Sequence, residues 1–153
     1  TLVINMPPQA IADRYTVTED TPLARTAATG VLANDLDAEG DSLTAMLESS
    51  TSHGTLTLQA NGSFQYQPVP DFAGQDVFSY RITDGIDTSE SASVTIEVQP
   101  VNDPPVAEPD AYFALPDQAL QISAATGVLA NDTDIDSIRL EATLAAARPQ
   151  AVT

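Results

Sequence analysis

Hydrophobic and polar residues alternate along much of the chain, which is the pattern of strands that bury one face. The alternation is clearest in residues 55–58, 63–66, 78–82 and 94–98, where Leu, Phe, Tyr, Ile or Val takes every second position. Weaker alternation occurs in residues 14–18, 23–27 and 42–49. No segment shows sustained helical spacing. The sequence therefore predicts an all-β chain of short strands.

The dipeptide Asn61-Gly62 separates two of the clearest segments. It predicts a tight hairpin with a type I′ turn, because both residues readily take positive φ angles. Five aromatic side chains are expected in the core: Phe64, Tyr66, Phe72, Phe78 and Tyr80. About seven strands in fewer than about 100 residues are typical of an immunoglobulin-like sandwich.

An internal repeat divides the chain. Residues 27–37 (AATGVLANDLD) match residues 124–134 (AATGVLANDTD) at 10 of 11 positions, and Asp13 corresponds to Asp110 at the same offset of 97 residues. Such self-similarity indicates a tandem array of structural units. The neighbouring repeats of the same chain are therefore expected partners of each copy.

The repeat predicts four segments. Residues 1–11 are expected to be the end of a preceding repeat and its linker, because Asn5-Met6-Pro7-Pro8 corresponds to Asn102-Asp103-Pro104-Pro105. Residues 12–99 form the complete repeat, and residues 100–109 form a Pro-rich linker, which we expect to be extended and stiff. Residues 110–153 are a truncated second repeat that lacks counterparts of the later strands.

Composition narrows the partners. The 153 residues include 22 Asp and Glu but only 5 Lys and Arg, for a formal charge of −17. This charge repels phosphate backbones and excludes nucleic acid as a partner. No apolar run approaches the roughly 20 residues of a membrane span, so direct membrane insertion is not expected. Without Cys, the chain has neither disulfides nor thiolate metal sites.

Carboxylates and amides cluster after the repeated motif, in residues 34–41 (NDLDAEGD) and 131–136 (NDTDID). Calcium takes six to eight oxygen ligands from flexible loops, which such segments can supply. They are not EF-hands, because Met46 occupies the position of the bidentate Glu and the flanks are not helical. The alternative is that both are ordinary Asn- and Asp-rich turns solvated by water.

Taken together, five motifs resemble the bacterial cadherin-like repeats that occur in tandem in large surface adhesins, including those grouped with VCBS repeats. The motifs are EDTP (residues 19–22), GVLANDLDAEGDSLT, HGTLTLQANGSFQYQP, FAGQDVFSYRITDG and VNDPPVA. The resemblance extends over roughly residues 10–144. It implies an immunoglobulin/cadherin-like β-sandwich followed by an incomplete second copy, a secreted or cell-surface location, and Ca²⁺ held at the junctions between repeats.

The same resemblance implies which residues hold the calcium. One junction would use five residues: Glu19, Asn102, Asp103, Asp132 and Asp134. The junction with a preceding repeat would use Asp35, Asp37 and Asp84. Met6 stands where the second linker has Asp103, so the first junction is expected to bind calcium more weakly. Pro116 in place of Glu19, and Ser137-Ile138 in place of Gly40-Asp41, weaken further sites downstream.

We expect a structural and adhesive module of a bacterial adhesin, not an enzyme. No Gly-x-Ser-x-Gly elbow is present, and adjacent Asp residues in a turn lack the buried pocket that would separate their pKa values. His53, without a second His or a Cys, is expected to be a turn residue. The alternatives are a carbohydrate- or protein-recognition module with a cell-surface or matrix ligand, and an inert spacer without metal. The absence of Trp argues against a sugar platform.

Overall fold

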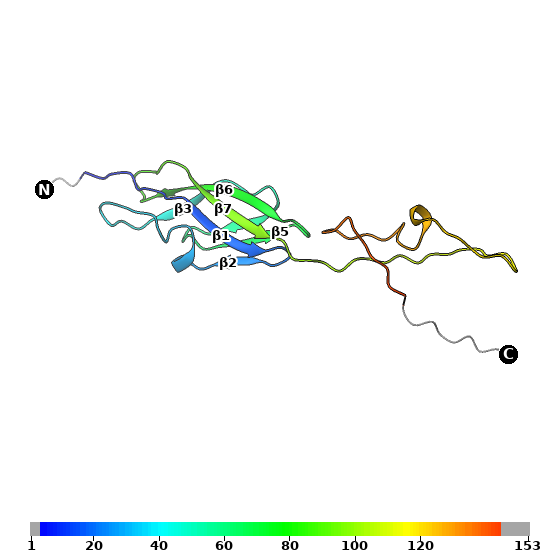
Figure 1. Ribbon diagram of the computed structural model, residues 1–153. Helices are drawn as coiled ribbons and strands as arrows, with labels where there is room; N and C mark the ends of the chain where they lie inside the picture. Colours follow the sequence, from blue (N-terminus) through cyan, green and yellow to red (C-terminus); the bar gives the residue numbers. More distant parts are fainter. Residues whose placement is uncertain (1–3, 145–153) are drawn as a thin grey trace. The chain divides into compact units, whose positions relative to one another are not determined.

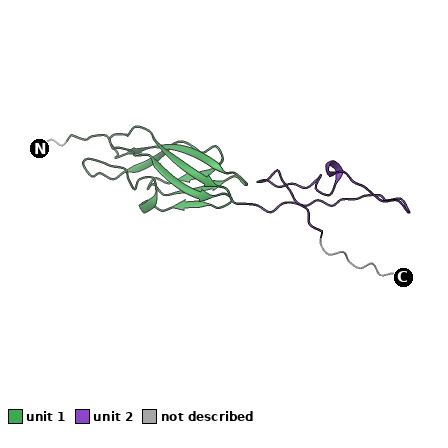
Figure 2. Cartoon of the chain, in the orientation of Figure 1, with its two compact units in different colours: residues 1–101 green, residues 102–153 purple. Residues whose placement is uncertain are grey.

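The computed structural model describes residues 4–144, so parts of the predicted first and last segments, residues 1–3 and 145–153, lie outside the described residues. The chain divides into two compact units, residues 1–101 and 102–153 (Figures 1 and 2). All seven strands of the described chain belong to the first unit.

The first unit is a sandwich of two sheets, which confirms the all-β prediction. One sheet has the order β1-β7-β6-β3 and the other the order β2-β5-β4. β1 pairs with β7 in parallel, and every other pair is antiparallel. The strands are β1 (Asp13–Thr18), β2 (Leu23–Arg25), β3 (Thr44–Ser49), β4 (Gly54–Leu58), β5 (Phe64–Pro68), β6 (Gly74–Thr83) and β7 (Ala92–Gln99).

The core lies between the two sheets and comes from the alternating positions. Phe64, Tyr66, Phe78 and Tyr80 are almost completely buried, as predicted, while Phe72 is half-buried at the edge of the core. The ring of Phe64 packs edge-on against Phe78, with 5.7 Å between centroids. β5, β6 and β7 supply most of the buried residues, because their alternation is the most regular.

Two local predictions are wrong. The strand predicted over residues 23–27 ends at Arg25, and Ala27–Thr29 forms a 3₁₀ turn. The β4–β5 hairpin forms, but without a type I′ turn, since only Gly62 of its loop has positive φ. The Gln59 N–H donates to the Ser63 carbonyl at 2.9 Å, which leaves a three-residue loop. That geometry is a type I turn closed by a residue in the left-handed region.

A buried carboxylate fastens the segment before β4 to the sandwich. Asp76 on β6 is 2% exposed and accepts hydrogen bonds from the Ser52 and His53 amides and from the Tyr66 hydroxyl. Burial alone would raise the pKa of Asp76, but these bonds outweigh burial and hold the pKa below its usual value. His53 lies in the bend before β4 and stacks on Phe72 with 4.3 Å between ring centroids.

The second unit has a different character. Within residues 102–144, the structure contains an isolated bridge between Val106 and Thr133 and a 3₁₀ turn at Ala124–Thr126, but no strand. None of these residues is buried, and Phe113 is 96% exposed. The described part of the second copy therefore has no hydrophobic core of its own.

Candidate functional site

The acidic loop of the first unit, residues 34–41, follows the most buried part of the repeated motif. Val31 is fully buried, and its amide donates to the Gly62 carbonyl at 3.0 Å. Gly30 has to be glycine, because a Cβ there would lie 2.0 Å from the same carbonyl oxygen. Beyond Leu32 the chain turns outward, and Leu36 forms a two-way backbone bridge with Gln9. The loop is therefore held between the β4–β5 hairpin and the N-terminal linker.

The side chain of Asp35 points from this loop toward the sandwich. Its Oδ1 accepts hydrogen bonds from the Ile11 amide at 2.7 Å and from the Tyr80 hydroxyl at 3.0 Å. The same hydroxyl lies 3.3 Å from Asp13 and 3.0 Å from the Val31 carbonyl. One hydroxyl proton thus faces several acceptor oxygens. This region therefore has more acceptors than donors, and it favours a bound proton or cation.

The pKa values follow from this crowding. Burial and the negative charge of Asp35 together raise the pKa of Asp13 to about 6, although hydrogen bonds from Tyr80 and Asn34 partly oppose the shift. Burial also raises the pKa of Asp35, although hydrogen bonds from Ile11 and Tyr80 partly oppose the shift. Burial and the two carboxylates raise the pKa of Tyr80. Asp13 therefore takes up a proton near pH 6, well above the pH at which an ordinary carboxyl does so.

Asp37 folds back on its own loop. Its Oδ1 accepts hydrogen bonds from the amides of Glu39 at 3.0 Å and Asp41 at 2.9 Å, which shapes the turn around Gly40. Its Oδ2 is shielded from solvent and has no hydrogen-bond partner among the residues that the structure describes. A buried carboxylate oxygen without a hydrogen-bond partner is a good ligand for a hard cation, which would compensate its negative charge.

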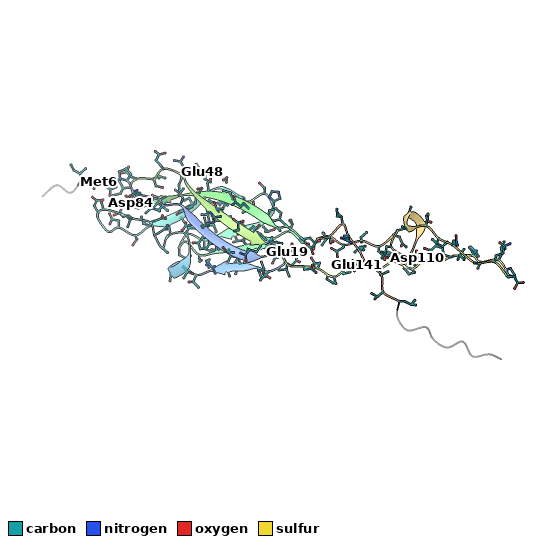
Figure 3. All side chains as sticks on the ribbon, viewed as in Figure 1. Met6, Glu19, Glu48, Asp84, Asp110 and Glu141 are labelled. Carbon is teal, nitrogen blue, oxygen red and sulfur yellow. The ribbon has the colours of Figure 1, made fainter. Side chains whose placement is uncertain are left out.

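Asp84 lies in the turn after β6 and contacts the linker. The side-chain amide of Asn5 donates to Oδ2 of both Asp84 and Asp87, at 2.9 Å each. The bond from Asn5 lowers the pKa of Asp84. The Met6 amide donates to Glu39 at 3.3 Å. Met6 and Asp84 are labelled at the same end of the sandwich in Figure 3.

These contacts bring the predicted residues of the first site to one end of the unit, but not to one point. As a set, the carboxylate oxygens of Asp35, Asp37 and Asp84 do not lie within 4.8 Å of one another. Asp35 is bonded inward, Asp37 within its loop and Asp84 to the linker. The arrangement surrounds the linker with hard oxygen donors, the type of ligand that calcium prefers.

Glu19 lies at the opposite end of the first unit. It is 5% exposed, and its backbone amide donates to the Gln99 carbonyl at 2.9 Å. One carboxylate oxygen accepts a short hydrogen bond from the Val101 amide. Glu19 therefore holds the chain where it leaves β7. Its neighbour Asp20 has a positive φ of 57°, and so does Asp117, the equivalent position of the second copy, at 58°.

The other predicted residues belong to the second unit, which repeats the loop contacts of the first. The Glu108 amide donates to Asp132 at 2.8 Å, as Ile11 does to Asp35. The Asp136 amide donates to Asp134 at 2.9 Å, as Glu39 does to Asp37. Asp103 donates its amide to Asp136 at 2.6 Å, and the Asn102 side chain donates to the Asp103 carbonyl.

Sequence reasoning missed several participants. Asn5 was detectable, because it is the counterpart of Asn102 in the offset of 97 residues. Asp87 contacts the same Asn5 amide as Asp84, but only three-dimensional proximity shows this. Nothing in the sequence indicates that the buried Tyr80 hydroxyl reaches Asp13 and Asp35.

In the described part of the chain, no helix is long and apolar enough to cross a membrane.

Comparison with known proteins agrees with this description. A family model described as a bacterial cadherin-like domain matches residues 5–100. No curated protein matches the chain. Among solved structures, the endo-fucoidan hydrolase MfFcnA9 of glycoside hydrolase family 107 is 20% identical, with a TM-score of 0.42, over 60% of this chain and 16% of the hydrolase. MfFcnA4 of the same family is 21% identical, with a TM-score of 0.41, over 66% and 16%. These likenesses are too slight to bear on function.

Proposed function

Since the chain belongs to the family of bacterial cadherin-like domains, we propose that it is a structural and adhesive repeat module of a large bacterial surface or secreted adhesin. Domains of this family are typically extracellular and non-enzymatic. The proposed partners are neighbouring repeats of the same chain, together with a cell-surface or matrix ligand. In this role the module is not an enzyme.

We further propose that calcium stiffens the junctions. The observation that carries this proposal is the contact between the N-terminal linker and the acidic loops, through Asn5 to Asp84 and Met6 to Glu39. The orphaned Oδ2 of Asp37 fits a hard cation. Cadherin-like domains generally bind calcium. Asp35, Asp37 and Asp84 would serve the first junction, and Glu19, Asn102, Asp103, Asp132 and Asp134 the second.

Bound calcium would neutralise carboxylates that otherwise repel one another in a chain of charge −17. A cation held by both linker and loop would also restrict the linker. Extracellular modules bind calcium at about 10⁻⁴ to 10⁻³ M. A module of this affinity is loaded outside the cell and empty at cytosolic calcium concentrations.

A calcium titration followed by the melting temperature tests the proposal. At about 10 mM calcium, we expect a rise of about 5 °C or more, because a ligand that binds only the folded state stabilises it by mass action. Magnesium at the same concentration should give a much smaller rise. Equal responses to the two ions, or no response to calcium, would refute the metal site.

Three variants locate the ion. Asp37→Asn should reduce the calcium response, whereas Glu90→Gln, which removes an exposed carboxylate outside both loops, should leave it unchanged. Met6→Asp restores the acidic residue of the second linker and should strengthen binding several-fold in calorimetric titration. For the second junction, the double substitution Asp103→Asn with Asp134→Asn should remove calcium binding. If it changes nothing, the second copy is an inert spacer.

A further inference from the structure

One segment of the chain, residues 49–70, contains no acidic residue and neither Lys nor Arg, although the chain contains 22 acidic and 5 basic residues. This segment forms the β4–β5 hairpin. The acidic residues are therefore concentrated elsewhere, and the hairpin is where another strongly acidic molecule can approach with the least repulsion.

β4 is an edge strand with unused main-chain groups. Two residues that flank β4 bond to the β5 side: the Gln59 amide donates to the Ser63 carbonyl, and the His53 carbonyl accepts from the Val69 amide. Continuing this alternation through the register, Thr55 and Thr57 are the residues of β4 that bond to β5. In an antiparallel pair, the intervening residues direct their N–H and C=O groups to the other side. These are Gly54, Leu56 and Leu58. Among the described residues, nothing bonds to the outward main-chain groups of Leu56 or Leu58, whereas the Gly54 carbonyl accepts a hydrogen bond from the Thr51 hydroxyl at 3.0 Å.

The other three edges of the sandwich carry features that discourage strand pairing. On β1, Arg14 forms an ion pair with Glu97 at 2.9 Å. β3 has a register shift between Leu47 and Ser49 and carries the charged Glu48. β2 is three residues long and follows Pro22. β4 has no charge, no proline and no register shift along its five residues.

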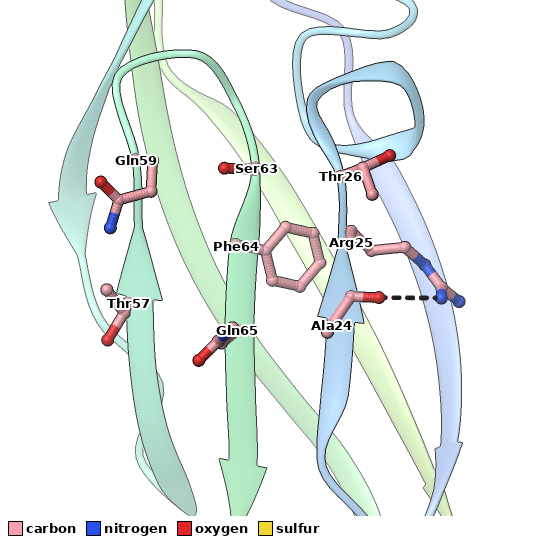
Figure 4. A pocket seen from close by; sticks show the side chains of 8 residues that line it. All are labelled: Ala24, Arg25, Thr26, Thr57, Gln59, Ser63, Phe64 and Gln65. Carbon is pink, nitrogen blue, oxygen red and sulfur yellow. Dashed lines mark hydrogen bonds between the residues drawn. The ribbon is translucent and has the colours of Figure 1, made fainter.

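The sheet face beside this edge carries no charge on β4 or β5, and its one charged side chain, Arg25, lies beyond β5 on β2. Thr57 and Gln65 point outward next to each other from β4 and β5, with Ala24 beyond them on β2 (Figure 4). Thr55 and Gln67 continue this face, around a shallow hollow of about 390 Å³. All of these uncharged side chains are exposed. Hydroxyls and amides here can extend a contact made at the edge.

We propose that a second copy of this chain docks on this edge, with β4 pairing antiparallel to β4 of the copy. An antiparallel pair has a twofold axis, so a single edge strand is its own complement. Among the registers that pair outward groups, the one that includes all five residues of β4 places Leu56 opposite Leu56 of the copy and Gly54 opposite Leu58. Thr55 then lies opposite Thr57, a favourable cross-strand pair. The two three-stranded sheets become one continuous sheet across the contact.

The test measures association of the full chain in EDTA, which separates this contact from calcium binding. Sedimentation velocity from about 0.05 to about 1 mM should show a reversible dimer with a Kd at or below about 1 mM. A salt concentration of about 150 mM screens the general repulsion between acidic chains. A chain that stays monomeric throughout this range overturns the proposal.

Charge substitutions test the register. Thr55→Lys with Thr57→Lys places like charges opposite each other twice and should weaken association about tenfold. Thr55→Glu with Thr57→Lys places opposite charges at the same two pairs and should restore association. The matched control, Thr16→Lys with Thr18→Lys, adds the same charges to exposed positions of β1 and should leave association unchanged.

Melting curves verify that each variant is folded. Failure of the Glu–Lys variant to restore association overturns the proposed register, and so does equal weakening by the β1 control. Slower hydrogen exchange at the Leu56 and Leu58 amides of the dimer supports the pairing directly. Unchanged exchange at both amides in a dimeric sample places the contact elsewhere and overturns it.

Discussion

The two copies of the repeat share a loop but not a core. Asn34 and Asn131 donate to equivalent linker carbonyls, and the bridge between Gln9 and Leu36 recurs between Val106 and Thr133. In the first unit this loop is pressed against a buried sandwich, whereas residues 102–144 have no buried residue. The loop geometry is therefore encoded locally. The stability of the first unit depends on β4 to β7, whereas residues 102–144 contain no strand.

The sharpest test of this difference is removal of an aromatic side chain from each unit. Phe78→Ala should lower the free energy of unfolding by about 3–5 kcal/mol, because Phe78 is fully buried and its loss leaves a cavity. Phe113→Ala, at a side chain that is 96% exposed, should change it by less than about 0.5 kcal/mol. Urea-induced unfolding measures both. Similar losses would mean that the second unit contributes to a shared core.

A second test removes a buried charge from the first unit, whereas residues 102–144 contain no buried residue at all. Asp76→Asn should cost about 2 kcal/mol at pH 7, because Asp76 accepts several hydrogen bonds as an anion. The lowered pKa of Asp76 means that its contribution is complete above the unfolded pKa of about 4 and is lost as the pH falls through the lower folded value. The two proteins should therefore converge in stability under strong acid. A difference that stays constant with pH would assign the effect to shape instead of charge.

The smallest expected effect compares one glycine in both copies. Gly30→Ala should destabilise the first unit by about 1–3 kcal/mol, since the new Cβ would overlap the Gly62 backbone. At Gly127, the equivalent position, the nearest atom to a Cβ is the Ser123 carbonyl oxygen at 3.1 Å. Gly127→Ala should therefore leave the melting temperature nearly unchanged. An equal loss at both positions would show that the motif is strained by itself.

The alternation of hydrophobic and polar residues predicted the strands well where one face of the strand is buried and the other is exposed. β5, β6 and β7 were located because Phe64, Phe78 and Val94 begin regular alternating runs. The parallel pairing of β1 with β7 was not predictable, since Asp13 and Val94 are distant in sequence and pair only through the closed sandwich. The prediction of a type I′ turn is wrong because the pairing of β4 with β5, and not the Asn-Gly dipeptide, determines the length of the loop.

The sequence predicted which loops carry the acidic residues of the candidate site, but not how their side chains are oriented. Alternate Asp residues converge only in a regular strand or a coordinating loop, and here Asp35 and Asp37 lie in a turn that directs them to different partners. The linker residue Asn5 connects Asp84 and Asp87, and this contact depends on how the first residues pack. Long-range packing of this kind leaves no mark in the local sequence.

The parallel pair of β1 and β7 has a mechanical consequence. In a parallel pair, β1 begins at the end of the sandwich opposite to the one where β7 ends, as Figure 1 shows for the first unit. Tension applied through the flanking linkers therefore pulls the two strands past each other along their length. The six paired positions from Asp13 to Thr18 bear this load together instead of opening one after another. We therefore expect such a domain to resist stretching along the direction in which an array would be pulled, because several hydrogen bonds must break together.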